Sequence, residues 1–183
     1  MFRQSVVVLA GMAILAGAAA GDTSQCACDV KKPETLKARE CSLCAEAEKQ
    51  PPGTEYFVLK DVNPRKPNRW LVLPRAHAAG AHPLHELPAA ARGRLWRKAM
   101  EVGAEKFGTE FGVAYNGAKV RTQCHTHVHV GRWIPAAETS KFRLVRRIED
   151  IPAPADSGVL VRPVKGGYLV LMGEHIVETA LVR

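Results

Sequence analysis

The chain has 183 residues, 46% of them hydrophobic and 24% charged, a balance typical of one folded globular domain rather than a disordered chain. Its formal net charge of +8 favours anionic partners such as phosphate esters, nucleotides or an acidic membrane surface. Aromatic residues make up only 6%, and the lysines and arginines are scattered, so the composition argues against a nucleic-acid-binding protein.

The first 20 residues have the pattern of an export signal. A basic residue, Arg3, precedes an apolar run from Val6 to Leu15, and small residues with a plausible cleavage position follow. The alternative is an uncleaved N-terminal anchor, although the uncharged stretch 5–21 is short of the ~20 residues that span a bilayer. In either case we expect the protein in the periplasm or at the outer face of the inner membrane.

Residues 21–54 are polar, resemble a loop and contain four of the five cysteines. Two strands are then predicted, "EYFVLKDV" (55–62) and "RWLVLP" (69–74), and the proline-containing turn "NPRKPN" between them indicates a hairpin.

A long amphipathic helix is predicted over residues 88–107. Apolar or small residues recur at positions 96, 100, 103 and 107 with charges between them, and Gly108 follows as a stop. We expect the apolar face of this helix to pack on a sheet.

The second half of the chain predicts mainly strands. They are "FGVAYNG" (111–117), ending in an Asn-Gly turn, "CHTHVHVGRW" (124–133), and a C-terminal hairpin of "VLVRPV" and "YLVLMG". The expected fold is α+β, an antiparallel sheet with one main helix packed on it. Its catalytic domain would span residues 55–135, and residues 136–183 would be an extension of the same domain.

Three histidines alternate along the fourth predicted strand. If residues 124–133 are extended, His125, His127 and His129 share one face, spaced about 6.6 Å apart. Packing alone does not explain such a row, because each buried imidazole needs partners and can charge near neutral pH. Two chemistries suit it: metal binding with an open position, or nucleophilic catalysis by one oriented imidazole.

The surrounding motifs resemble a known family. "HTHVHV" fits the histidine-triad (HIT) pattern, and "YFVLKDVN", "RWLVLP" and "YNG…RTQCHTHVHV" resemble the CDP-diacylglycerol pyrophosphatase branch of the HIT superfamily. The resemblance covers roughly residues 40–135. It implies a HIT-like sheet and a nucleotidyl-transfer reaction.

The resemblance also implies roles for individual residues. His127, the middle histidine, would attack the α-phosphate of a nucleotide and carry a covalent nucleotidyl group. His129 would stabilise charge near the phosphate, and Asn116 would orient His127 through its other ring nitrogen.

Four further residues are candidates for substrate binding. Arg121, Thr122 and Gln123 lead into the triad and would contact and position phosphate. Arg69 occupies a position where many relatives have a histidine, so it could offer a cationic fork to phosphate but could not shuttle a proton. No carboxylate stands beside the triad in the sequence, which argues against a two-metal site and for catalysis that requires no cofactor.

The cysteines leave two alternatives open. Several HIT relatives bind structural zinc, and the matching residues here are Cys41, Cys44, His77 and His125. Export instead favours disulfides, with Cys41–Cys44 as the rival pairing.

The resemblance therefore predicts an exported hydrolase that cleaves CDP-diacylglycerol to CMP and phosphatidate. The expected partners are the anionic liponucleotide and a membrane surface, with a homodimer as a form that relatives adopt. The alternatives are a HIT-type hydrolase of soluble nucleotides, such as dinucleoside polyphosphates or phosphoramidates, and a periplasmic metal-binding protein.

Overall fold

The computed structural model of the chain describes residues 23, 26–77, 79–137 and 141–183. The expected signal or anchor, residues 1–20, lies outside them. Within the described residues, no helix combines the length and the apolar character needed to cross a bilayer.

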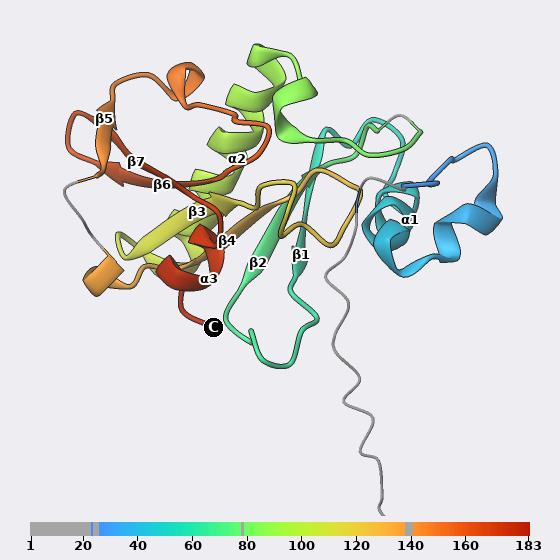
Figure 1. The fold of residues 1–183 in the computed structure, drawn as a ribbon, viewed down its shortest axis with the longest axis horizontal. Helices are drawn as coiled ribbons and strands as arrows, with labels where there is room; N and C mark the ends of the chain where they lie inside the picture. Colours follow the sequence, from blue (N-terminus) through green and yellow to red (C-terminus); the bar gives the residue numbers. More distant parts are fainter. Residues whose placement is uncertain (1–22, 24–25, 78, 138–140) are drawn as a thin grey trace, which may run out of the picture.

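Seven strands form one antiparallel sheet in the order β1-β2-β4-β3-β6-β7-β5 (Figure 1). The strands are β1 (Tyr56–Lys60), β2 (Trp70–Pro74), β3 (Phe111–Tyr115), β4 (Val128–Arg132), β5 (Arg143–Val145), β6 (Gly158–Val164) and β7 (Gly167–Gly173). The predicted hairpins are confirmed as β1–β2 and β6–β7. Because β5 to β7 continue the same sheet, the C-terminal third of the chain belongs to the fold that carries the histidines.

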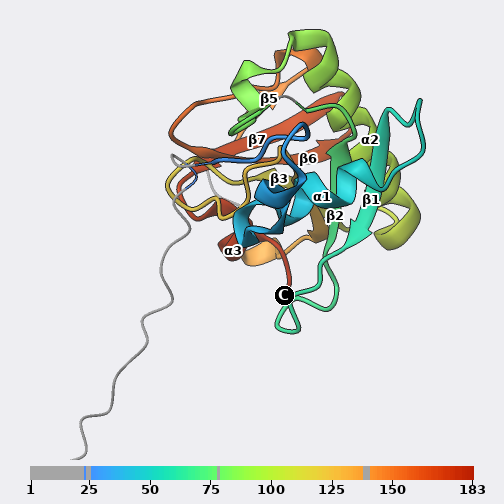
Figure 2. The ribbon, with the colours of Figure 1, turned by 90° about the vertical axis from the view of Figure 1, so that its right-hand side faces the viewer.

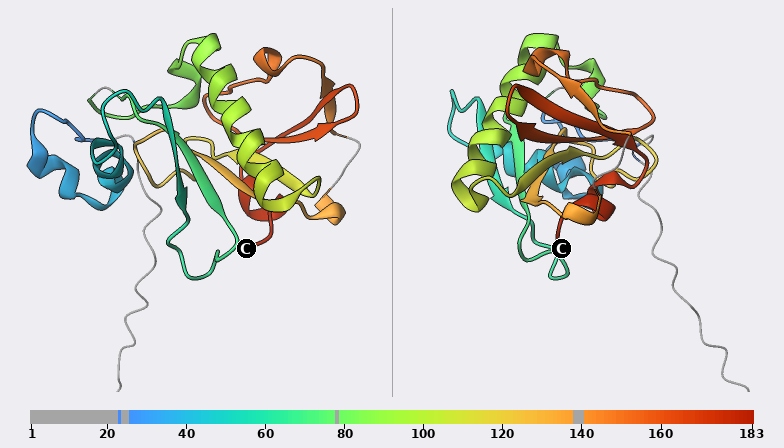
Figure 3. Two further views of the ribbon diagram at one scale, coloured as in Figure 1. Left: turned by 180° about the vertical axis from the view of Figure 1, so that it is seen from behind. Right: turned by 90° about the vertical axis from the view of Figure 1, so that its left-hand side faces the viewer.

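Helix α2 (Ala89–Phe107) covers one face of this sheet (Figure 3). It ends before Gly108, whose φ of 63° suits glycine. Trp96 is fully buried against the sheet, and a Cβ at Gly103 would lie 2.1 Å from the Phe111 ring, so a glycine is required where helix and strand meet. The predicted α+β class, with one main helix on an antiparallel sheet, is confirmed.

The opposite face of the sheet carries two short helices with a gap between them. One row of cross-strand neighbours lies on this face: Leu71, His129, Ala114, Leu160 and Leu171. Helix α1 (Ser42–Glu48) packs over the Leu71 end, and α3 (Ile176–Ala180) packs over the end formed by Ala114 and Leu160. His129, in the middle of the row, is left between the two helices.

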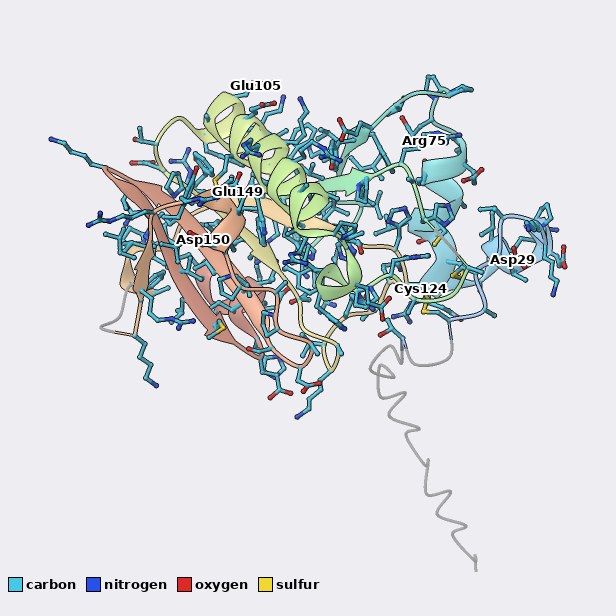
Figure 4. All side chains as sticks on the ribbon, turned by 90° about the horizontal axis from the view of Figure 1, so that it is seen from above. Asp29, Arg75, Glu105, Cys124, Glu149 and Asp150 are labelled. Atoms are coloured by element: carbon cyan, nitrogen blue, oxygen red, sulfur yellow. A yellow bond between two sulfur atoms is a disulfide. The ribbon has the colours of Figure 1, made fainter. Side chains whose placement is uncertain are left out.

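The segment before β1 is tied to the sheet by two disulfides. It forms two short 3-10 helices, η2 (Pro33–Lys37) and η3 (Arg39–Cys41), which lead into α1. The disulfides are Cys26–Cys124 and Cys28–Cys41, and Figure 4 shows their sulfur atoms gathered beside Cys124. The pairing Cys41–Cys44 is therefore not formed, and Cys44 is a buried free thiol. Two disulfides are consistent with an oxidising, exported compartment.

Three further 3-10 helices lie in the connections: η4 (Leu84–Glu86), η5 (Pro135–Ala137) and η6 (Ile148–Asp150).

The predicted strand 124–133 is too long, because β4 begins only at Val128. Residue Cys124 is fixed outside the sheet: its N–H donates to the Glu40 carbonyl, and its own carbonyl accepts from the N–H of His82. The Asn-Gly turn also differs from the expectation. The Gly117 carbonyl accepts from the N–H groups of residues 120 and 121, so the turn starts at Gly117 and opens a long loop.

Candidate active site

A cavity of about 640 Å³ opens on the sheet face between α1 and α3. His127 and His129 contribute to its lining. The apolar side chains that line it are Leu43, Leu59, Val62, Leu71 and Val120. The charged side chains that line it are Arg39, Glu46, Lys60, Asp61, Lys66 and Glu178.

His127 is held by the backbone rather than by a side chain. Its Nδ1 donates to the carbonyl oxygen of His125 at 2.8 Å, which fixes the tautomer and leaves the Nε2 lone pair for chemistry. Burial lowers the pKa of His127 to about 4, against the opposing effect of that hydrogen bond. A neutral, oriented imidazole is the form that acts as a nucleophile.

His129 lies next to His127, with the ring centroids 5.0 Å apart. Asn116 Nδ2 approaches His129 Nε2 at 3.4 Å, whereas the family resemblance implied a contact between Asn116 and His127. Burial, followed by the neighbouring His127 and the charges of Arg69 and Lys66, holds the pKa of His129 well below 6.5. Asn116 therefore orients the third histidine, and the His125 carbonyl orients the second.

His125 does not join this pair. Because the chain bends at Cys124 and His125 before β4 begins, its ring packs instead against His77 and His82, at centroid distances of 4.9 and 5.9 Å. The expectation of three histidines on one strand face is therefore wrong, since of the three only His127 and His129 line the cavity.

The four expected substrate-binding residues separate into two pairs. Thr122 and Gln123 line the cavity, and Gln123 also accepts from Ser42 Oγ at 2.9 Å, which joins the loop before β4 to α1. Arg121 is directed elsewhere: its Nη1 donates to Tyr115 Oη at 2.7 Å and to the His82 carbonyl at 3.3 Å. Arg69 is fully buried, and its guanidinium contacts the C-terminal segment.

Several lining residues were not found from the sequence. Asp61 and Lys66 lie in the β1–β2 hairpin, and Glu178 lies on α3, so the fold supplies carboxylates that the residues around the triad lack. Asp61 falls in the "LKDVN" motif, which was a usable signal. No sequence signal indicated Glu178, because only the sheet topology brings α3 close to the histidines.

A second group of potential ligands lies behind the first triad histidine. Atoms of Cys44, His77 and His82 that can bind a metal lie within 4.8 Å of one another. Nε2 of His125 is buried beside them without a hydrogen-bond partner among the described residues. Cys41, expected as a ligand, cannot bind a metal here because its sulfur is bonded to that of Cys28. Cysteine and histidine groups could thus bind a metal here, with His82 in the place expected for Cys41.

Comparison with known protein families adds no identification, since no family model matches the sequence.

Proposed function

We propose that the protein is an exported HIT-type hydrolase that cleaves the pyrophosphate of CDP-diacylglycerol. The observation that carries this proposal is the neutral His127 imidazole in the lining of the cavity, with Nδ1 occupied by a backbone carbonyl and Nε2 left for the substrate. The motif resemblance supplies the reaction, and the neighbouring His129 fits the role of a group that stabilises charge on phosphate.

In the proposed reaction, Nε2 of His127 attacks the phosphorus of the cytidylyl group. A phosphorus–nitrogen bond forms while the bond from that phosphorus to the bridging oxygen breaks, and phosphatidate leaves with the oxygen. Water then attacks the same phosphorus, releases His127 and gives CMP. Because the imidazole is already neutral and oriented, no proton has to be removed from it before the first step.

The lining of the cavity favours a lipid-linked substrate over a soluble nucleotide. Its apolar lining residues include Val62, which is 95% exposed. Leu71 lies next to His129 in the sheet and Leu59 lies next to Leu71, so apolar side chains beside the reactive histidine give the diacylglycerol part a place to lie. A place beside an anionic membrane surface would fit the proposed periplasmic location and the positive net charge of +8.

The test is turnover by the purified protein on CDP-diacylglycerol in detergent micelles and on a soluble dinucleotide. We expect CMP release from the lipid by the wild type and none by His127→Ala. Cleavage of the soluble nucleotide alone would leave the nucleophile in place and remove the lipid assignment. No turnover of either compound would refute the proposal.

A structural zinc site is a second proposal, supported by the cluster of Cys44, His77 and His82. Burial raises the pKa of the Cys44 thiol to about 11, and a metal would replace its proton. Glu48 lies 3.1 Å from His77 Nε2, the outer contact that commonly fixes a ligating histidine. Together with His125 this gives one sulfur and three imidazoles, a donor set that suits tetrahedral zinc.

Metal analysis of the purified protein tests this site. We expect about one equivalent of zinc in the wild type and in His127→Ala, and loss of it in Cys44→Ala and His82→Ala. An equal zinc content in all four proteins, or none in the wild type, would contradict the proposal. Zinc that disappears with His127 would indicate metal binding by the triad itself.

A further inference from the structure

A lysine and a glutamate from distant parts of the chain meet at the cavity wall. Lys66 Nζ, in the β1–β2 hairpin, donates to Glu178 Oε1 on α3 at 2.6 Å, and both side chains line the cavity. The lysine side chain is only 20% exposed. Among the three lining cations, which also include Arg39 and Lys60, Lys66 alone has an ion pair within the described part of the chain.

The buried guanidinium of Arg69 fixes the position of α3. Its Nη2 donates to the carbonyl oxygens of Val177 at 2.9 Å and Leu181 at 2.8 Å, and its Nη1 donates to Glu178 Oε1 at 3.0 Å. The last carbonyls of a helix have no partner within the helix, so Arg69 satisfies groups that would otherwise be buried without one. Figures 1 and 2 show the C-terminus beside the β1–β2 hairpin, as these bonds require.

The charge of Lys66 reaches both reactive histidines, because it is among the causes that lower the pKa of His127 and of His129. Glu178 stays ionised: burial opposes this, but Lys66 and Arg69 lower its pKa. The Glu178 carboxylate is thus shared by three cations, Lys66, Arg69 and, at 4.0 Å, Arg183, and of these only Lys66 lines the cavity. Asp61 and Glu46 also line the cavity, and their carboxylates would repel a phosphate ester. Such a ligand would therefore need a fixed cation close to the histidines.

We infer that Lys66 binds the phosphate oxygens of the substrate and that Glu178 is the positioning residue that holds it for this role. A lysine ammonium has three donors, so the bond to Glu178 leaves two for the ligand. Helix α3 is then part of the active site, although it lies outside the stretch that carries the family resemblance. The inference rests on the proposed function for its substrate, while phosphate binding is measurable without turnover.

The test compares the wild type with Lys66→Met, Lys66→Arg and Glu178→Gln. The matched control is Lys98→Met, which breaks the 3.2 Å pair between Lys98 and Glu101 on α2, away from the cavity. The first readout is the dissociation constant of inorganic pyrophosphate by calorimetry. The second is kcat and KM for CDP-diacylglycerol.

We expect Lys66→Met to weaken pyrophosphate binding by about tenfold to hundredfold and to raise KM similarly, the usual effect of losing one charge-assisted hydrogen bond. Lys66→Arg should restore most of the binding, Glu178→Gln should weaken it by a smaller factor, and Lys98→Met should match the wild type. If the wild type binds no pyrophosphate, or Lys66→Met binds it equally well, the inference is overturned. Lys66-dependent binding without turnover would support the inference and refute the proposed function, because only the latter requires hydrolysis.

Discussion

Removing the disulfide Cys26–Cys124 should destabilise the protein more than removing Cys28–Cys41. The first closes a loop of 98 residues and the second a loop of 13. A cross-link removes chain entropy from the unfolded state by about 2.1 cal/mol/K plus 1.5R ln n, which corresponds to about 4.7 kcal/mol for the long loop and about 3 kcal/mol for the short one. The difference, about 1.8 kcal/mol, is the more reliable quantity, because the constant in the relation cancels.

The assay is guanidinium unfolding of Cys26→Ala/Cys124→Ala beside Cys28→Ala/Cys41→Ala, followed by tryptophan fluorescence. Each variant loses two sulfur atoms, so each serves as the control for the other. We expect a lower free energy of unfolding for the variant without the long-range disulfide. Equal losses, or a larger loss for the short-range variant, would contradict both the pairing and the loop-entropy argument.

Three further predictions follow from buried groups. Gly103→Ala should lower the free energy of unfolding by about 1–2 kcal/mol, because the clash of the new Cβ with Phe111 outweighs the higher helix propensity of alanine. Adding Phe111→Leu to this variant should recover part of the loss, as chemical denaturation would measure. The metal-free protein should lose stability as pH falls from about 6.5 towards 4. Burial lowers the pKa of His125 to about 3 and of His127 to about 4, so as pH falls the unfolded chain takes up protons before the folded protein does. The free energy of unfolding should therefore fall by up to about 1.4 kcal/mol per pH unit for each histidine. Unfolding curves that do not change between pH 7 and 5 would contradict this. Cys44 should resist alkylation by iodoacetamide at pH 8 in the native metal-free protein, because its thiol is buried and its pKa is raised. After unfolding without reductant, mass spectrometry should show one added carboxamidomethyl group. Rapid labelling of the native protein would mean that the thiol is exposed.

The elements with strong local patterns were predictable from the sequence. Helix α2 carries its own period and its stop at Gly108, and the hairpins β1–β2 and β6–β7 carry their turn residues, so each forms where the residues alone indicate. Alternation also predicted that His127 and His129 lie on the same side of the sheet. His129 is in β4 and His127 comes directly before it, so the two are separated by two positions of extended chain.

The features that the sequence did not predict depend on contacts between residues that are far apart in the chain. Alternation placed His125 in the row, but the disulfide from Cys26 to its neighbour Cys124 bends the chain away from the sheet. Lys66 and Glu178 are separated by 112 positions, and only the order of the strands brings them together. Local sequence patterns carry no record of such contacts.

In the proposed reaction, His127 carries a covalent nucleotidyl group. The measurement is an alkaline quench of the protein during turnover of CDP-diacylglycerol, since phosphoramidate bonds survive base better than acid. Reduction, which releases Cys124 from Cys26, and tryptic digestion then give the peptide 122–132 for mass spectrometry. We expect a cytidylyl adduct located on His127 and absent from His127→Ala. A protein that releases CMP at full rate with no adduct on this peptide, or with the adduct on another residue, would contradict it.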